Sequence, residues 1–91
     1  MTDQDDGEES FAEETLIQAI ENQIDSESPP AARAVFNKLS LVGYEREDAL
    51  HLMALVLAHE IEAMLAEDRA FDGEWYEQAL RALPTLPGED E

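Results

Sequence analysis

Apolar residues recur at helical spacing in four segments of this chain, and no segment alternates between apolar and polar residues as a half-exposed strand would. The first predicted helix begins at Ser10, which with Glu13 matches a capping box, and ends near Asp25. The second follows Ser28 and two prolines and ends at Gly43, because serine can cap a helix and glycine adopts a left-handed conformation without penalty. The apolar stripes consist of Phe11, Leu16, Ile17, Ile20 and Ile24 in the first helix and Ala31, Ala32, Val35, Phe36 and Leu39 in the second.

The third predicted helix, roughly residues 45–67, is the longest and contains no glycine or proline. Its apolar residues cover more than one stripe, which is typical of a helix that lies at the centre of a bundle or is shared with a partner. They are Ala49, Leu50, Leu52, Met53, Val56, Leu57, Ile61, Met64 and Leu65. Asp72 is the predicted cap of a fourth helix, which buries Trp75, Tyr76, Ala79, Leu80 and Leu83 and is ended by Pro84.

These segments predict an all-α fold, a small four-helix bundle with a long central third helix. The helical domain is expected over residues 10–84, between a disordered acidic tail at residues 1–9 and a second disordered tail at residues 85–91. A chain of 91 residues has room for one core, and 44% hydrophobic residues suffice to build it.

The charge of the chain restricts its partners. There are 23 acidic and 5 basic residues, a formal net charge of −18, and Lys38 is the only lysine. Direct binding to nucleic acid or to an anionic membrane is not expected, because both need basic residues. Acidity of this kind suits a high-salt cytoplasm, and it also occurs in merely acidic proteins of ordinary cells.

Several classes of site and location are not expected from the sequence. The chain contains no cysteine, which excludes disulfides, thiolate metal ligands and cysteine nucleophiles. We find no signal peptide, no apolar run that approaches the length of a membrane span and no motif for a bound cofactor. The expected location is the cytoplasm, and an enzymatic activity is less expected than none.

Candidate chemistry gathers around the histidines of the third helix. His51 follows Glu47 by four residues and Asp48 by three, so a carboxylate could form half of a metal site or an acid–base pair with it. An exposed pair without function explains the same spacing. His51 and His59 cannot share one ion within a chain, since eight helical residues separate them by about 12 Å of rise and about 80° of rotation.

The remaining polar and aromatic residues have structural explanations beside functional ones. Trp75 and Tyr76 could form a recognition patch, although core packing explains their place in an amphipathic helix. The four arginines, Arg33, Arg46, Arg69 and Arg81, are expected to form ion pairs with the acidic majority.

The middle of the chain resembles a family of small, uncharacterised bacterial helical proteins, a domain of unknown function. The matching residues are Glu21-Asn22-Gln23, Pro29-Pro30-Ala31-Ala32-Arg33, Leu39, Gly43, Arg46-Glu47-Asp48-Ala49-Leu50-His51, Phe71-Asp72, Tyr76 and Leu80, within residues 16–83. The resemblance implies a bacterial source and an all-helical fold but no activity. Its members tend to carry more histidines, and Ile17 and Glu47 stand at the corresponding places here. If that family has a metal or proton site at these places, this chain keeps at most three of its residues, Glu21, Asp48 and His51.

Three functions remain open at this point. The first is a non-enzymatic protein–protein interaction module, with a homodimer through the third helix as one form of it. The second is a metal-binding or acid–base site built on Glu21, Asp48 and His51. The third is an acidic mimic of nucleic acid that binds a basic partner.

Overall fold

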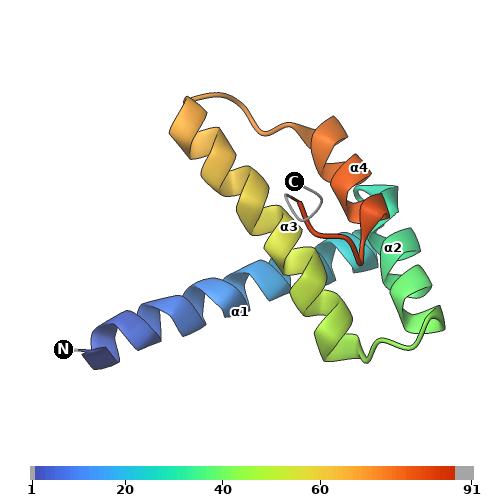
Figure 1. Cartoon of the computed structure of the whole chain (residues 1–91), viewed down its shortest axis with the longest axis horizontal. Helices are drawn as coiled ribbons and strands as arrows, with labels where there is room; N and C mark the ends of the chain where they lie inside the picture. The colour runs from blue at the N-terminus through green and yellow to red at the C-terminus, as the bar shows by residue number, and fades with distance from the viewer. Residues whose placement is uncertain (1, 88–91) are drawn as a thin grey trace.

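The computed structural model describes residues 2–87, and their side chains from residue 13 onward. It consists of four helices in chain order (Figure 1), namely α1 (Thr2–Ser26), α2 (Pro30–Leu41), α3 (Arg46–Glu67) and α4 (Gly73–Ala82). No strand is present in residues 2–87. The predicted small all-α, four-helix fold with a long third helix is therefore confirmed.

The predicted signals account for two of the helix boundaries, the C-terminal end of α2 and the N-terminal end of α4. Asp72 is the N-cap of α4, and its Oδ1 accepts a hydrogen bond from the backbone N–H of Trp75 at 3.0 Å. Gly43 directly follows the C-cap of α2 and has φ +109°, a conformation that suits glycine. The predicted cap at Ser28 is wrong, because the N-cap of α2 is Pro29 and no side chain caps this helix.

The helix at the N-terminus differs from its prediction. Ser10 lies inside α1, which begins at Thr2, so it is not the N-cap that the capping-box pattern predicted. A helical start among acidic residues is favoured by the helix dipole. The predicted tails at 1–9 and 85–91 include residue 1 and residues 88–91, which lie outside the described residues, and the disorder of both tails stays a prediction.

Helices α2 and α3 each pack against all the other helices, whereas the backbones of α1 and α4 do not approach each other closely within the described residues. Figure 1 shows α3 crossing α1 and then continuing away from it, so that the C-terminal end of α3 and the N-terminal half of α1 both project from the bundle. This arrangement leaves α3 covered along its first half and open on one side along its second half.

The core consists of side chains that the periodicity placed on the apolar stripes. Ile20, Leu39, Met53 and Leu80 are fully inaccessible to solvent and come from each of the four helices in turn. Leu65, which the wide apolar arc of α3 included, is instead 70% exposed. A periodic pattern gives the direction in which a side chain points, but it does not show whether a neighbouring helix extends far enough to cover that side chain.

Helix α3 has the length and composition of a membrane span, with a mean hydropathy of 1.5 over 18 residues. The sequence-based expectation that no apolar run approaches this length therefore needs correction. The core helix of a soluble domain meets the same criteria, and 39% of that α3 window is buried within this fold. The other residues of this helix are partly buried or exposed within the described part of the chain.

Candidate functional site

The predicted polar trio does not come together. A groove of about 440 Å³ between α1 and the first half of α3 is lined by Glu21 and His51, together with Glu13, Ile17, Arg46, Glu47 and Leu50. Asp48 is exposed and is not part of this lining.

Each of the two residues in the groove already has a partner on the opposite helix. Oε2 of Glu21 accepts a hydrogen bond from Nη2 of Arg46 at 3.1 Å, and Nδ1 of His51 lies 3.1 Å from Oε2 of Glu13. All four of these side chains are at least 40% exposed, so water screens both pairs. Among the described residues, no group of three or more histidine and acidic side chains is arranged to hold a metal ion. The groove is a polar contact between two helices, and its geometry gives the metal hypothesis no support.

The arginines pair with acidic residues, as expected. Beside the Arg46 pair, Arg33 contacts Glu27 at 2.9 Å and Arg81 contacts Glu77 at 3.5 Å. The fourth arginine, Arg69, differs from the others because its partner is buried.

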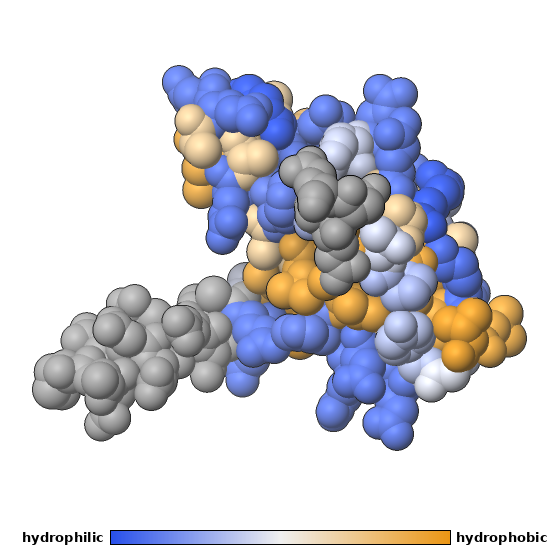
Figure 2. Space-filling model, in the orientation of Figure 1, coloured by the Kyte–Doolittle hydropathy of each residue, from blue (hydrophilic) through white to orange (hydrophobic). Residues whose placement is uncertain are grey.

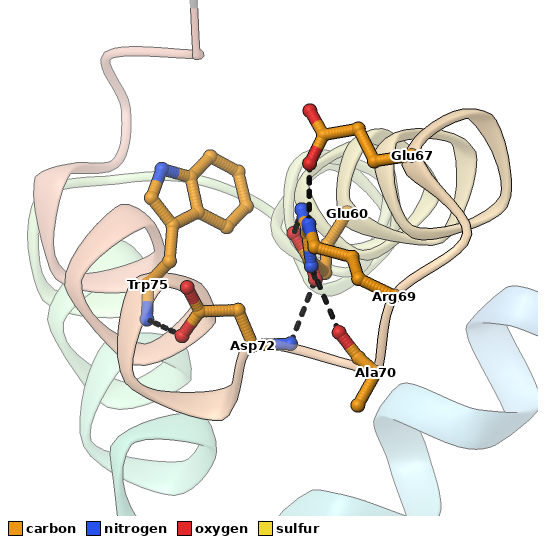
Figure 3. A network of polar contacts seen from close by, with 6 residues as sticks. All are labelled: Glu60, Glu67, Arg69, Ala70, Asp72 and Trp75. Atoms are coloured by element: carbon orange, nitrogen blue, oxygen red, sulfur yellow. Dashed lines mark hydrogen bonds and ion pairs between the residues drawn. The ribbon is translucent and has the colours of Figure 1, made fainter.

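That partner is Glu60 of α3, the only charged residue that is buried in the described part of the chain, with 1% of its surface exposed. Figure 3 shows its carboxylate facing the loop between α3 and α4. Arg69 donates to both oxygens, from Nη1 at 2.7 Å and from Nη2 at 3.2 Å, and the backbone N–H of Asp72 donates at 2.8 Å. Two-pronged contact of this kind fixes the orientation of both groups as well as their distance.

The electrostatics of this network favour the ionised form of both partners. Hydrogen bonds from Arg69 and from the N–H of Asp72 hold the pKa of Glu60 below its ordinary value of 4.5, although burial opposes them. The same pairing raises the pKa of Arg69, and Glu67 contributes through a second hydrogen bond to its Nε. Ionised Glu60 therefore carries no proton to donate, and both of its oxygens accept hydrogen bonds within the chain.

Glu60 holds the α3–α4 loop in place, and through the loop it positions α4. It fixes the backbone of Asp72, whose side chain caps the first turn of α4. Sequence reasoning missed this residue. The available signal was its position four residues after Val56 and seven after Met53, on the stripe that the core occupies.

The aromatic residues of α4 are also engaged within the chain. The ring of Trp75 stacks on His59 with 5.4 Å between centroids, beside the Glu60 network. The hydroxyl of Tyr76 donates to Oε1 of Gln23 at 2.8 Å, which joins α4 to α1 across the bundle. Burial raises the pKa of Tyr76 to about 12. Core packing, rather than an exposed recognition patch, accounts for Tyr76, whose residue surface is 2% exposed.

Among the described residues, one apolar side of α3 becomes more exposed toward the C-terminal end of the helix. Leu50 and Ala54 are 4% and 3% exposed, and the same side of the helix continues through Ala58 and Ile61, which are partly buried, to Leu65, which is 70% exposed. These residues follow one another at intervals of four, four, three and four, which places them on one side of the helix. We name Ala58, Ile61 and Leu65 the open stripe. Figure 2 shows hydrophobic residues at this projecting end of α3.

The radius of gyration of the chain is 13.6 Å, against about 12 Å expected for a compact chain of its length, because the N-terminal half of α1 projects from the bundle (Figure 1).

The fold and these contacts define a small acidic all-α domain whose buried charge serves the packing of its own loop. No protein-family model, curated protein or solved structure matches this chain. The resemblance to uncharacterised bacterial helical proteins accordingly stays a prediction.

Proposed function

We propose that this chain is a non-enzymatic protein–protein interaction module and that the open stripe of α3 is its binding surface. The observation that carries the proposal is the rise in exposure along one side of α3, from 4% at Leu50 to 70% at Leu65. Connected apolar surface on a soluble domain often marks a site of protein–protein contact.

The polar groups support a binding role over a catalytic one. Glu60, the carboxylate with the most perturbed surroundings, is saturated by Arg69 and the backbone of Asp72. His51 and Glu13 form an exposed pair that lacks a third group to orient it, within the described residues. These contacts stabilise the fold, and they engage Glu60, His51 and Glu13 within the chain.

A second exposed apolar pair provides a matched control. Leu41 and Val42, at the end of α2, are 87% and 65% exposed and lie away from the open stripe. Figure 2 shows hydrophobic surface in this region as well, at the lower right.

Thiol alkylation in living cells tests the proposal, because the chain contains no cysteine of its own. We expect the thiol of a Leu65→Cys variant to react more slowly in the cell than in dilute purified protein, since a partner covers it. The thiol of a Leu41→Cys variant should react equally in both. Equal reactivity of the Leu65→Cys thiol in the two settings would refute the proposal.

A membrane is the alternative occupant, and the same reagent distinguishes it. Neutral phospholipid vesicles added to the dilute purified Leu65→Cys variant should leave its reactivity unchanged. Protection by vesicles alone would assign the open stripe to a lipid surface instead of a protein.

A further inference from the structure

The dipeptide Asp72-Gly73 stands where the α3–α4 loop passes into α4, and it contains the two groups from which an isoaspartate forms. Aspartate followed by glycine is the sequence most prone to this change, because glycine has no side chain to hinder the approach of its nitrogen to the carboxyl group. We infer that Asp72 is a site of spontaneous isomerisation, and that its hydrogen bonds, above all the one to Glu60, keep this site inactive in the folded chain.

The reaction needs no oxidant and no second protein. The backbone nitrogen of Gly73 attacks Cγ of Asp72, a C–N bond forms, and the hydroxyl of the protonated carboxyl leaves as water together with the hydrogen of that nitrogen. The product is a succinimide, a five-membered ring. Water then opens the ring, and where it cleaves the bond between the nitrogen and the original main-chain carbonyl, the backbone continues through the side chain as isoaspartate.

Three features leave the reacting groups accessible. Asp72 is exposed, so water can reach the ring and open it. No atom lies within 4 Å of the place where a Cβ on Gly73 would stand, so nothing shields this side of the dipeptide. Gly73 is the first residue of α4, and N–H groups in the first turn of a helix have no acceptor within the helix, so ring closure costs no helical hydrogen bond at this nitrogen.

The folded chain holds Asp72 on both sides. Its Oδ1 accepts a hydrogen bond from the N–H of Trp75 at 3.0 Å. Its own N–H donates to Oε2 of Glu60 at 2.8 Å, and Arg69 fixes that carboxylate through two further hydrogen bonds. Closing a ring on Cγ changes the torsion angles of Asp72 and breaks its bond to Trp75, so this end of the network must open before the reaction can proceed.

Isomerisation at this position also disrupts the start of α4. The main-chain carbonyl of Asp72 accepts the first helical hydrogen bond, from the N–H of Tyr76 at 3.0 Å. Isoaspartate converts that carbonyl into a free carboxylate and lengthens the backbone by one carbon. The Glu60 network therefore protects the first turn of α4 from a covalent change, besides positioning it.

The experiment measures isoaspartate at Asp72 while the intact folded chain is incubated for weeks at neutral pH and body temperature. Trypsin cleaves after Arg69 and Arg81, and the resulting peptide of residues 70–81 contains Asp72 as its only aspartate. Chromatography separates the two isomers of this peptide, and mass spectrometry identifies them. A synthetic peptide of the same sequence, incubated alongside, gives the rate when nothing holds Asp72.

We expect the folded wild type to form isoaspartate at least about tenfold more slowly than the peptide, a factor that corresponds to about 1.4 kcal/mol of local opening. A Glu60→Gln variant should react about fivefold faster than the wild type or more, because a neutral amide accepts weaker hydrogen bonds than a carboxylate. A Glu21→Gln variant makes the same substitution in the exposed pair with Arg46, and it should react as the wild type does.

An Arg69→Lys variant provides a second measurement if Glu60→Gln does not fold. Lysine keeps the charge and the tryptic cleavage but loses the two-pronged contact with Glu60, so the reaction should again be faster than in the wild type. Circular dichroism establishes that each variant is folded.

Three results would overturn the inference. They are a folded wild type that reacts as fast as the peptide, folded Glu60→Gln and Arg69→Lys chains that react no faster than the wild type, and equal acceleration by Glu21→Gln. The first would mean that the hydrogen bonds of Asp72 give no protection, and the others that Glu60 is not its source.

Discussion

Leu39 and Leu41 offer a direct test of the fold, since two leucines of the same helix differ only in burial. Leu39 is fully inaccessible and Leu41 is 87% exposed, although both lie in the last turn of α2. Replacing either with alanine makes the same change in helix propensity. A difference between the two variants therefore reports the packing of Leu39 alone.

The magnitude follows from the burial of the two side chains. Leu39→Ala removes three carbon groups from the core, which at about 0.8 kcal/mol each amounts to about 2.4 kcal/mol of lost transfer free energy. The residual cavity adds to this, so the expected loss in the free energy of unfolding is about 3 kcal/mol, within the usual range of about 2–5 kcal/mol. Leu41→Ala should change it by less than about 0.5 kcal/mol. A domain of 91 residues has about 5–14 kcal/mol in total, so the first variant loses a substantial share.

The assay is urea denaturation followed by far-ultraviolet circular dichroism, at a protein concentration low enough to keep the chain monomeric. We expect a lower midpoint for Leu39→Ala with an unchanged slope, and a wild-type midpoint for Leu41→Ala. A loss below about 1 kcal/mol for Leu39→Ala, or equal losses for both variants, would mean that α2 does not bury the face described here.

Three further predictions concern the backbone, the tyrosine and the buried carboxylate. Gly43→Ala should lower the free energy of unfolding by about 1–2 kcal/mol in chemical denaturation, because φ is +109° at that position. Gly73→Ala, in the first turn of α4 with open space around it, should be neutral or stabilising by up to about 1 kcal/mol. Equal effects of the two substitutions would contradict the backbone conformation at Gly43. Tyr76→Phe should cost about 1 kcal/mol of stability. In the wild type alone, the share of stability that depends on the neutral phenol should be lost as pH rises from the ordinary tyrosine pKa of 10.0 through about 12. Ultraviolet titration of tyrosinate measures this ionisation. Glu60→Gln should lower the melting temperature most above pH 4.5, and the gap to the wild type should close as acid protonates Glu60. The folded pKa of Glu60 lies below 4.5, and the contribution of its charge to stability disappears as pH falls through that folded pKa. A gap independent of pH would show that the charge of Glu60 does not hold Arg69.

The buried carboxylate shows where prediction from one sequence ends. The stripe of α3 that contains Met53 and Val56 also contains Glu60, and an isolated acid on such a stripe is ordinarily placed at the solvent edge. Its burial requires Arg69, and the loop after α3 alone brings that guanidinium back to the carboxylate. Likewise, His51 pairs with Glu13, which is 38 residues away in the sequence, and not with the neighbouring acids on its own helix.

By itself the sequence determined two of the helix ends and the inward faces of the helices. The ends of α2 and α4 follow from Gly43 and Asp72, because backbone conformation and capping depend on a few neighbouring residues. Helical periodicity likewise selected Ile20, Leu39 and Leu80 for the core, since spacing fixes the direction of each side chain about its helix axis.

Only the tertiary structure decided which apolar residues stay uncovered. Leu50 and Leu65 carry the same side chain on the same side of α3, yet one is 4% and the other 70% exposed. The difference arises because α1 lies against the first half of α3, where Ile17 and Leu50 line the same groove, and then diverges from it (Figure 1). The crossing angle of two helices depends on contacts between distant segments, and it is this angle that leaves Leu65 exposed.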